Sequence, residues 1–142
     1  MGQARVTHVL PDAPSTRGRP TAIVERQVII CSIEFRVRPG AEAVRDQLVA
    51  DLMKAVVLVD GFISKETLIS RDRPGQFVTI SVWRDEESLQ RWMRDPAHMR
   101  TIGVGKRSVF LSYRIQLATV YKDLAWSAPD APAAPAPDAP TT

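Results

Sequence analysis

Alternating apolar and polar residues predict a first strand over residues 23–37. One face of this strand is apolar throughout and carries Ile29, Cys31, Ile33, Phe35 and Val37. The other face begins with Val28 and Ile30 and then becomes polar. A strand that is apolar on both faces is typical of a sheet covered on both sides. We therefore expect helices over one face of the sheet and a further layer over the other.

The pattern then changes to a helical one and back. Residues 41–58 are predicted to form an amphipathic helix, because Val44, Leu48, Leu52 and Val56 recur at steps of four. Strands are predicted over 62–70 and 77–83, and the polar turn between them makes them antiparallel neighbours. In the first of these two strands, strict alternation places Phe62, Ser64, Glu66 and Leu68 on one face and Ile63, Lys65, Thr67 and Ile69 on the other.

The pattern of residues 84–98 predicts two short helices with a kink between them. Asp85 is a capping residue for the first helix, whose one face presents Leu89, Trp92 and Met93. Asp95-Pro96 ends that helix and begins the second, which carries His98 in its first turn. The glycine-rich stretch 103–107 is predicted to be a loop, and 108–123 a long last strand whose apolar face includes Tyr113.

The predicted order is β-α-β-β-α-β, which indicates an α+β, ferredoxin-like fold with a four-stranded antiparallel sheet. Helices would cover one face, while Val28, Ile30, Val78, Ile80 and Val82 make the other face apolar. A second copy of the chain is the simplest cover for such a face, so we predict a homodimer. We place the domain at 23–124, between a flexible amino-terminal arm at 1–22 and a disordered Pro/Ala-rich tail at 125–142.

Composition and charge argue against several classes of function. The 142 residues carry a net charge of only +3, and the basic residues form no stripe, which argues against a nucleic-acid partner. The single cysteine, Cys31, lies in an apolar run, so we predict no disulfide and no metal site built on thiolates. The chain has no run long enough to span a membrane and no secretory-type start, and we expect a cytoplasmic protein.

The chain resembles the antibiotic biosynthesis monooxygenase family, a branch of the dimeric α+β barrels. The resemblance covers about residues 28–123 and rests on the order and spacing of several short motifs. They are Arg38-Pro39-Gly40, Val59-Asp60-Gly61-Phe62, Trp83 followed by Asp85-Glu86-Glu87-Ser88-Leu89, Trp92, Pro96-Ala97 before His98, and Phe110-x-x-Tyr113.

The resemblance implies one pocket per subunit, between the sheet and its helices. Characterised members include oxygenases without a cofactor that act on polycyclic phenols or anthrones, and enzymes that bind and degrade haem. It therefore implies a cofactor-independent monooxygenase that uses O2 on a flat aromatic phenol, anthrone or quinol. Two departures leave alternatives open. Ile33 stands where such oxygenases have an asparagine, a residue absent from this chain, and Ile102 stands near the position of the haem ligand. The alternatives are a non-catalytic small-molecule-binding dimer and, third, a haem-binding or haem-degrading enzyme.

Three residues are candidates for catalysis. Trp92 could stack on a flat ring, His98 could act as a base because the positive helix end disfavours imidazolium, and Tyr113 could donate a hydrogen bond. Core packing is the competing explanation for Trp92 and Tyr113, and a surface or capping role for His98. We predict that the apolar walls of the pocket include Trp83, Ile33, Phe35, Met93 and Ile102.

Overall fold

The computed structural model describes residues 27–133. The predicted amino-terminal arm, the first residues of the predicted first strand and the end of the tail lie outside this range. The elements in chain order are β1 (Ile29–Val37), α1 (Glu42–Val56), β2 (Phe62–Ile69), β3 (Gln76–Trp83), α2 (Glu86–Arg94), α3 (Pro96–Val104), the π-helical turn η1 (Gly105–Val109) and β4 (Phe110–Thr119). None of the helices within 27–133 has the length and apolar character needed to cross a membrane.

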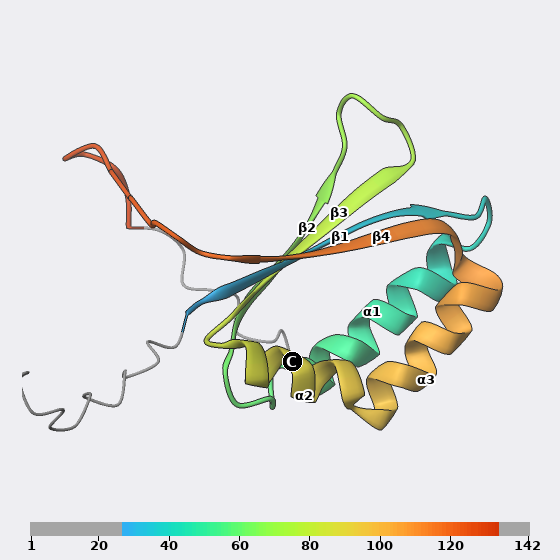
Figure 1. The fold of residues 1–142 in the computed structure, drawn as a ribbon. Coiled ribbons are helices and arrows are strands. Elements are labelled where there is room, and N and C mark those ends of the chain that lie inside the picture. The colour runs from blue at the N-terminus through green and yellow to red at the C-terminus, as the bar shows by residue number, and fades with distance from the viewer. Residues whose placement is uncertain (1–26, 134–142) are drawn as a thin grey trace, which may run out of the picture.

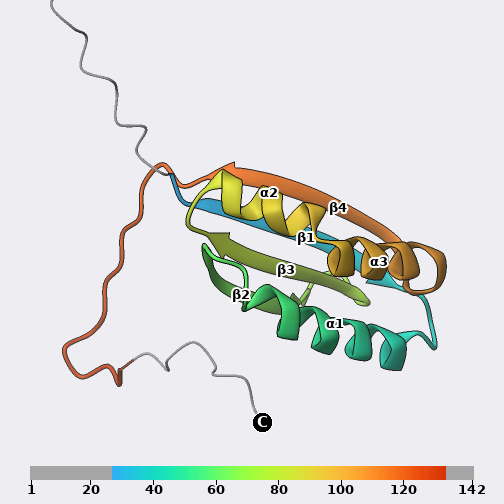
Figure 2. The ribbon, with the colours of Figure 1, turned by 90° about the horizontal axis from the view of Figure 1, so that it is seen from below.

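The four strands form one antiparallel sheet in the order β2-β3-β1-β4. Helices α1, α2 and α3 all lie on one face of this curved sheet (Figure 1), and the view from below shows them in front of the strands (Figure 2). The predicted ferredoxin-like β-α-β-β-α-β arrangement is therefore confirmed, with the second helical segment divided in two as expected.

The two faces of the sheet have the apolar patterns that the sequence predicts. Ile29, Cys31 and Phe35 are buried beneath the helices, and the core around them also contains Val56, Trp83, Leu89 and Trp92. On the opposite face, Ile30 lies across from Val82, and Glu34 from Val78. The apolar residues that β1 and β3 place on this face are half-buried, and no helix of the described chain covers them.

Strand β2 departs from the strict alternation that the sequence predicts. Phe62 is paired with Trp83, but the register shifts before Ser64, so that Lys65 is paired with Ser81. A bulge of this kind adds one residue to a strand and reverses which face the following side chains take. Phe62 and Lys65 were predicted on opposite faces, and they share the face beneath the helices.

The predicted loop at 103–107 is wrong. Helix α3 continues through Val104 and passes directly into η1, where the Ser108 hydroxyl donates to the Val104 carbonyl at 2.9 Å. Gly105 has helical backbone angles, and a methyl group there would overlap the Phe110 ring. The glycine therefore permits close packing and does not form a turn. In consequence the last strand begins at Phe110, and it ends at Thr119, short of the predicted limit.

Candidate functional site

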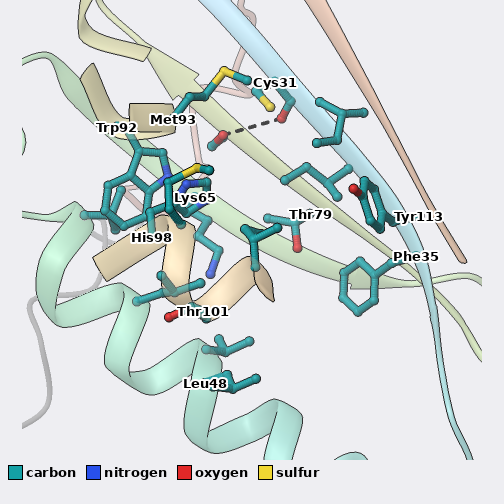
Figure 3. A pocket seen from close by; sticks show the side chains of 18 of the residues that line it. Cys31, Phe35, Leu48, Lys65, Thr79, Trp92, Met93, His98, Thr101 and Tyr113 are labelled. Atoms are coloured by element: carbon teal, nitrogen blue, oxygen red, sulfur yellow. Dashed lines mark hydrogen bonds between the residues drawn. The ribbon is translucent and has the colours of Figure 1, made fainter. Parts of the chain in front are cut away.

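A cavity of about 300 Å³ lies between the sheet and the helices (Figure 3). Its volume is at the lower end of the range for small-molecule sites. Side chains from all four strands and all three α-helices line it, and most of them are aliphatic or aromatic. All eight residues predicted for the site are among them, namely Ile33, Phe35, Trp83, Trp92, Met93, His98, Ile102 and Tyr113. The structure therefore brings the predicted set into one cavity, while the role of each residue stays a prediction.

Trp92 and His98 are in direct contact. Their ring centroids are 4.5 Å apart, with an angle of 38° between the planes. The local sequence explains this contact, because an Asp95 carboxylate oxygen accepts hydrogen bonds from the backbone amides of Ala97 (2.9 Å) and His98 (3.0 Å). Pro96 occupies the first position of α3, where its fixed backbone angle suits a helix start. This cap stops α2 just after Trp92 and begins α3 so that His98 returns onto the indole.

The surroundings of the His98 ring disfavour its charged form. Burial lowers the pKa of His98, against smaller opposing effects from a hydrogen bond with the Met93 backbone and from the Asp95 carboxylate. The predicted direction is right, but burial is the largest cause. The Nδ1 atom is buried and has no hydrogen-bond partner among the described residues. A neutral imidazole can accept a proton at the ring nitrogen that carries no hydrogen.

Tyr113 lies on the other side of the cavity from this pair. Figure 3 shows it near Phe35, across the cavity from Trp92 and His98. Its ring packs edge-on against Phe110 at 5.9 Å, and Phe110 packs edge-on against Phe35 at 5.5 Å. The three residues predicted for catalysis therefore do not converge on one point. A ligand that used all three would have to extend across the cavity.

Trp83 and Cys31 belong to the floor of the cavity. Trp83 is 1% exposed, packs edge-on against Phe62, and donates its indole N–H to the Ser81 hydroxyl at 3.0 Å. Its polar group is already used, so Trp83 offers a ligand only an apolar surface. Burial raises the pKa of the Cys31 thiol, which favours its protonated form.

Sequence reasoning missed Lys65 as a residue of the site. Lys65 is half-buried and lines the cavity, and its Nζ lies 3.5 Å from the Met53 sulfur. Burial lowers the pKa of its ammonium group. Strict alternation placed Lys65 on the face away from Phe62, and only the bulge brings it inward. The one signal in the sequence is a lysine inside a predicted strand, and this signal does not distinguish the two faces.

The described residues offer no cluster of metal ligands at the site, and the position implied for a haem ligand is occupied by Ile102. Among residues 27–133 no group of three or more His, Cys, Asp or Glu side chains could hold a metal ion. Ile102, which stands where the resemblance places the haem ligand, lines the cavity with a hydrocarbon side chain that cannot bind iron. His98 packs against Trp92 instead.

Comparison with known proteins agrees with the observed fold and identifies a matching family. The model of the family described as antibiotic biosynthesis monooxygenase matches residues 28–103, just over half of the chain. Jasmonate monooxygenase ABM of Pyricularia oryzae is 30% identical over 87 residues, which are 61% of this chain and 40% of that protein. The chain thus spans well under half the length of this curated relative.

Several solved structures share the fold. SnoaB of Streptomyces nogalater, described as a cofactor-independent oxygenase, superimposes in a mutant form with a TM-score of 0.61 at 21% identity, over 69% of this chain and 97% of SnoaB. A protein of Deinococcus radiodurans, described as a putative antibiotic biosynthesis monooxygenase, gives a TM-score of 0.63 at 16% identity, over 70% and 99% of the two chains. At these identities the superpositions establish a common fold.

Proposed function

Because the chain belongs to the antibiotic biosynthesis monooxygenase family, we propose that it is a cofactor-independent monooxygenase for a flat aromatic phenol, anthrone or quinol. The observation that carries this proposal is the contact of His98, whose surroundings disfavour its charged form, with the Trp92 ring in the wall of a largely apolar cavity. The names of SnoaB and of the Pyricularia protein, both oxygenases, support it.

In the proposed reaction His98 accepts a proton from the substrate and leaves an electron-rich anion. The anion passes one electron to O2, and the resulting radical and superoxide combine to form a peroxide. As the O–O bond breaks, the remaining C–H proton of that carbon passes to the leaving oxygen, which gives the C=O and hydroxide. The hydroxide takes the proton from His98, so that a ring CH2 and O2 become a C=O and water. Trp92 stacks on the substrate ring, and Tyr113 donates a hydrogen bond to an oxygen at its far end. The apolar walls keep water away from the anion.

Oxygen consumption with a panel of anthrones, naphthols and quinols tests the proposal. Replacing His98 with Gln should lower kcat by a factor on the order of 100 or more, because general-base catalysis contributes at least that much. Trp92→Phe should mainly raise KM, because the smaller ring offers less area for stacking on the substrate. Arg100→Gln, an exposed change on the same helix as His98, is the matched control and should have no effect. Wild-type protein that consumes no O2 with any member of the panel would contradict the proposal.

A second candidate is a ligand-binding protein without turnover. Ile33 favours it, because this residue lines the cavity where the resemblance places an asparagine and offers no hydrogen bond to a substrate. Thermal stabilisation by panel compounds without O2 consumption would distinguish this candidate from the first. The third candidate is a haem-binding or haem-degrading enzyme. Titration with haemin tests it, and the absence of a Soret shift that depends on His98 would exclude it.

We also propose that the chain acts as a homodimer whose subunits cover the open face of each other's sheet. Half-buried Ile30, Val78, Ile80 and Val82 give this face an apolar character without a helix over it. Beyond β4 the chain runs away from the sheet (Figure 1), and its side chains Tyr121 and Trp126 are 97% and 85% exposed. Apolar surface of this extent supports a partner of the same kind.

A further inference from the structure

The charged side chains that line the cavity are all basic. They are Arg45, Lys65 and Lys106, and no Asp or Glu is among the described lining residues. An apolar cavity whose only charges are positive attracts an anion, because low-dielectric walls leave the charge poorly screened.

Two of the three basic groups are already engaged. The Arg45 guanidinium forms an ion pair with Asp46 at 2.7 Å and lies 4.6 Å from the centre of the Phe77 ring. Lys106 is exposed, and its Nζ lies 5.7 Å from the centre of the Tyr113 ring. A carboxylate and an aromatic face therefore stabilise the charge of Arg45, and solvent and an aromatic face stabilise that of Lys106.

Lys65 differs from both. It is half-buried, and its Nζ donates only to the Met53 sulfur, which is a weak acceptor. Within residues 27–133 no carboxylate forms an ion pair with it. Burial already lowers the pKa of this ammonium group, which shows the cost of keeping the charge there unaided. A ligand anion would supply the missing partner.

The position of Lys65 suits a ligand that also reaches His98. The bulge in β2 turns Lys65 beneath the helices, opposite Ser81. Figure 3 shows Lys65 on the Trp92 and His98 side of the cavity, away from Tyr113 and Phe35. A histidine and a lysine on one side can provide a base and a counter-ion for the same end of a ligand.

We propose that Lys65 binds the anionic oxygen of an acidic, apolar ligand, so that the cavity selects carboxylates or phenolates over neutral molecules of the same shape. This deepens the proposed function, and it rests on that function only for the identity of the cavity as the substrate site. In the oxygenation, Lys65 would hold the deprotonated substrate as its anion after His98 accepts the proton.

Binding measured by calorimetry under anaerobic conditions tests the inference. The probes are naphthoate, naphthol and the neutral naphthalenemethanol, which share one ring system. Lys65→Met should raise the Kd of naphthoate by about tenfold or more, since a charge-assisted hydrogen bond is lost, and should leave naphthalenemethanol unchanged. Lys65→Arg should keep the preference for the anion. Lys54→Met is the matched control, because Lys54 is 80% exposed on α1 and should not affect any probe.

The absorption of bound naphthol distinguishes the two sources of the anion. A naphtholate band in the wild type that is lost in Lys65→Met assigns the site to phenolates, and a response of naphthoate alone assigns it to carboxylates. Circular dichroism establishes that each variant is folded. Equal affinity of wild type and Lys65→Met for every probe, or wild-type protein that binds naphthoate no better than naphthalenemethanol, would overturn the inference. Because no O2 is present, neither result depends on whether the protein is an oxygenase.

Discussion

The surroundings of His98 lead to a specific expectation for how activity depends on pH. Burial lowers its pKa below the ordinary value of 6.5, and a base works only in its deprotonated form. We therefore expect kcat/KM to be constant through neutral pH and to fall on the acid side along a single ionisation below 6.5. The measurement is a pH–rate profile by O2 uptake, together with an NMR titration in which His98→Gln identifies the His98 signals.

The same pKa shift has a consequence for stability. The unfolded chain takes up a proton on His98 near pH 6.5, while the folded chain takes it up only at lower pH. The contribution of this residue to stability is therefore complete above pH 6.5 and is lost as the pH falls toward the folded pKa. His98→Gln should flatten that part of the stability curve. A His98 that titrates at or above 6.5 in the folded protein would contradict both expectations.

At the residue scale, the position of His98 beside Trp92 follows from the sequence, and the position of Lys65 does not. The pairing of Trp92 with His98 follows from Asp95-Pro96, because a cap and a proline at fixed positions determine where one helix ends and the next begins. Lys65 could not be placed in the same way. Its orientation depends on a bulge that pairs Phe62 and Lys65 with successive inner-face positions of β3, and this pairing is a property of two strands together.

At the scale of elements, the junction of β2 with α2 depends on Gly61. Its backbone has φ +94°, and an added methyl group would overlap the Ser88 hydroxyl, which is fully buried at the start of α2. Gly75, in the turn between β2 and β3, has φ +78° with open space around it. The two glycines thus share the backbone requirement and differ in packing.

We predict that Gly61→Ala destabilises the protein by about 1–3 kcal/mol more than Gly75→Ala, because the first variant adds overpacking to the shared backbone strain. The strain alone should reduce the stability of Gly75→Ala by about 1–2 kcal/mol. Urea unfolding followed by circular dichroism measures the difference. Equal losses in the two variants would show that the α2 start moves freely and that Ser88 does not fix it.

Element boundaries were predictable where chemistry marks them. The Asp85 carboxylate accepts from the Ser88 amide at 2.8 Å, as its capping position predicts. The segment 103–107 carries two glycines, which are common in loops, and it was predicted as one. In the structure Gly105 is helical and the Phe110 ring packs closely against it, and no local pattern shows a contact five residues ahead.

At the scale of the molecule, strand order and the helix-covered face follow from the sequence, and the cavity does not. Two-residue periodicity decides which side chains point toward the helices. The volume left between them depends on how α1 and α3 are seated on the sheet, which spacing along the chain does not determine. Phe35 is predicted as a wall from its strand face, and Ile33 and Ile102 from the positions that the resemblance gives them; all three line the cavity.

The open face of the sheet leads to the last prediction. Ile80 lies in the middle of β3 on this face, between Ser32 of β1 and Glu66 of β2. If a second copy covers the face, Ile80→Glu buries a charge in the interface beside Glu66 and should convert the dimer to a monomer. Light scattering should give twice the 15.8 kDa chain mass for the wild type and a single chain mass for the variant.

Ala50→Glu, on an exposed position of α1, adds the same charge and should stay dimeric. A wild type that is monomeric at concentrations of about 50 μM, well above the Kd of a stable interface, would mean that the apolar face is tolerated in water and that each cavity works alone.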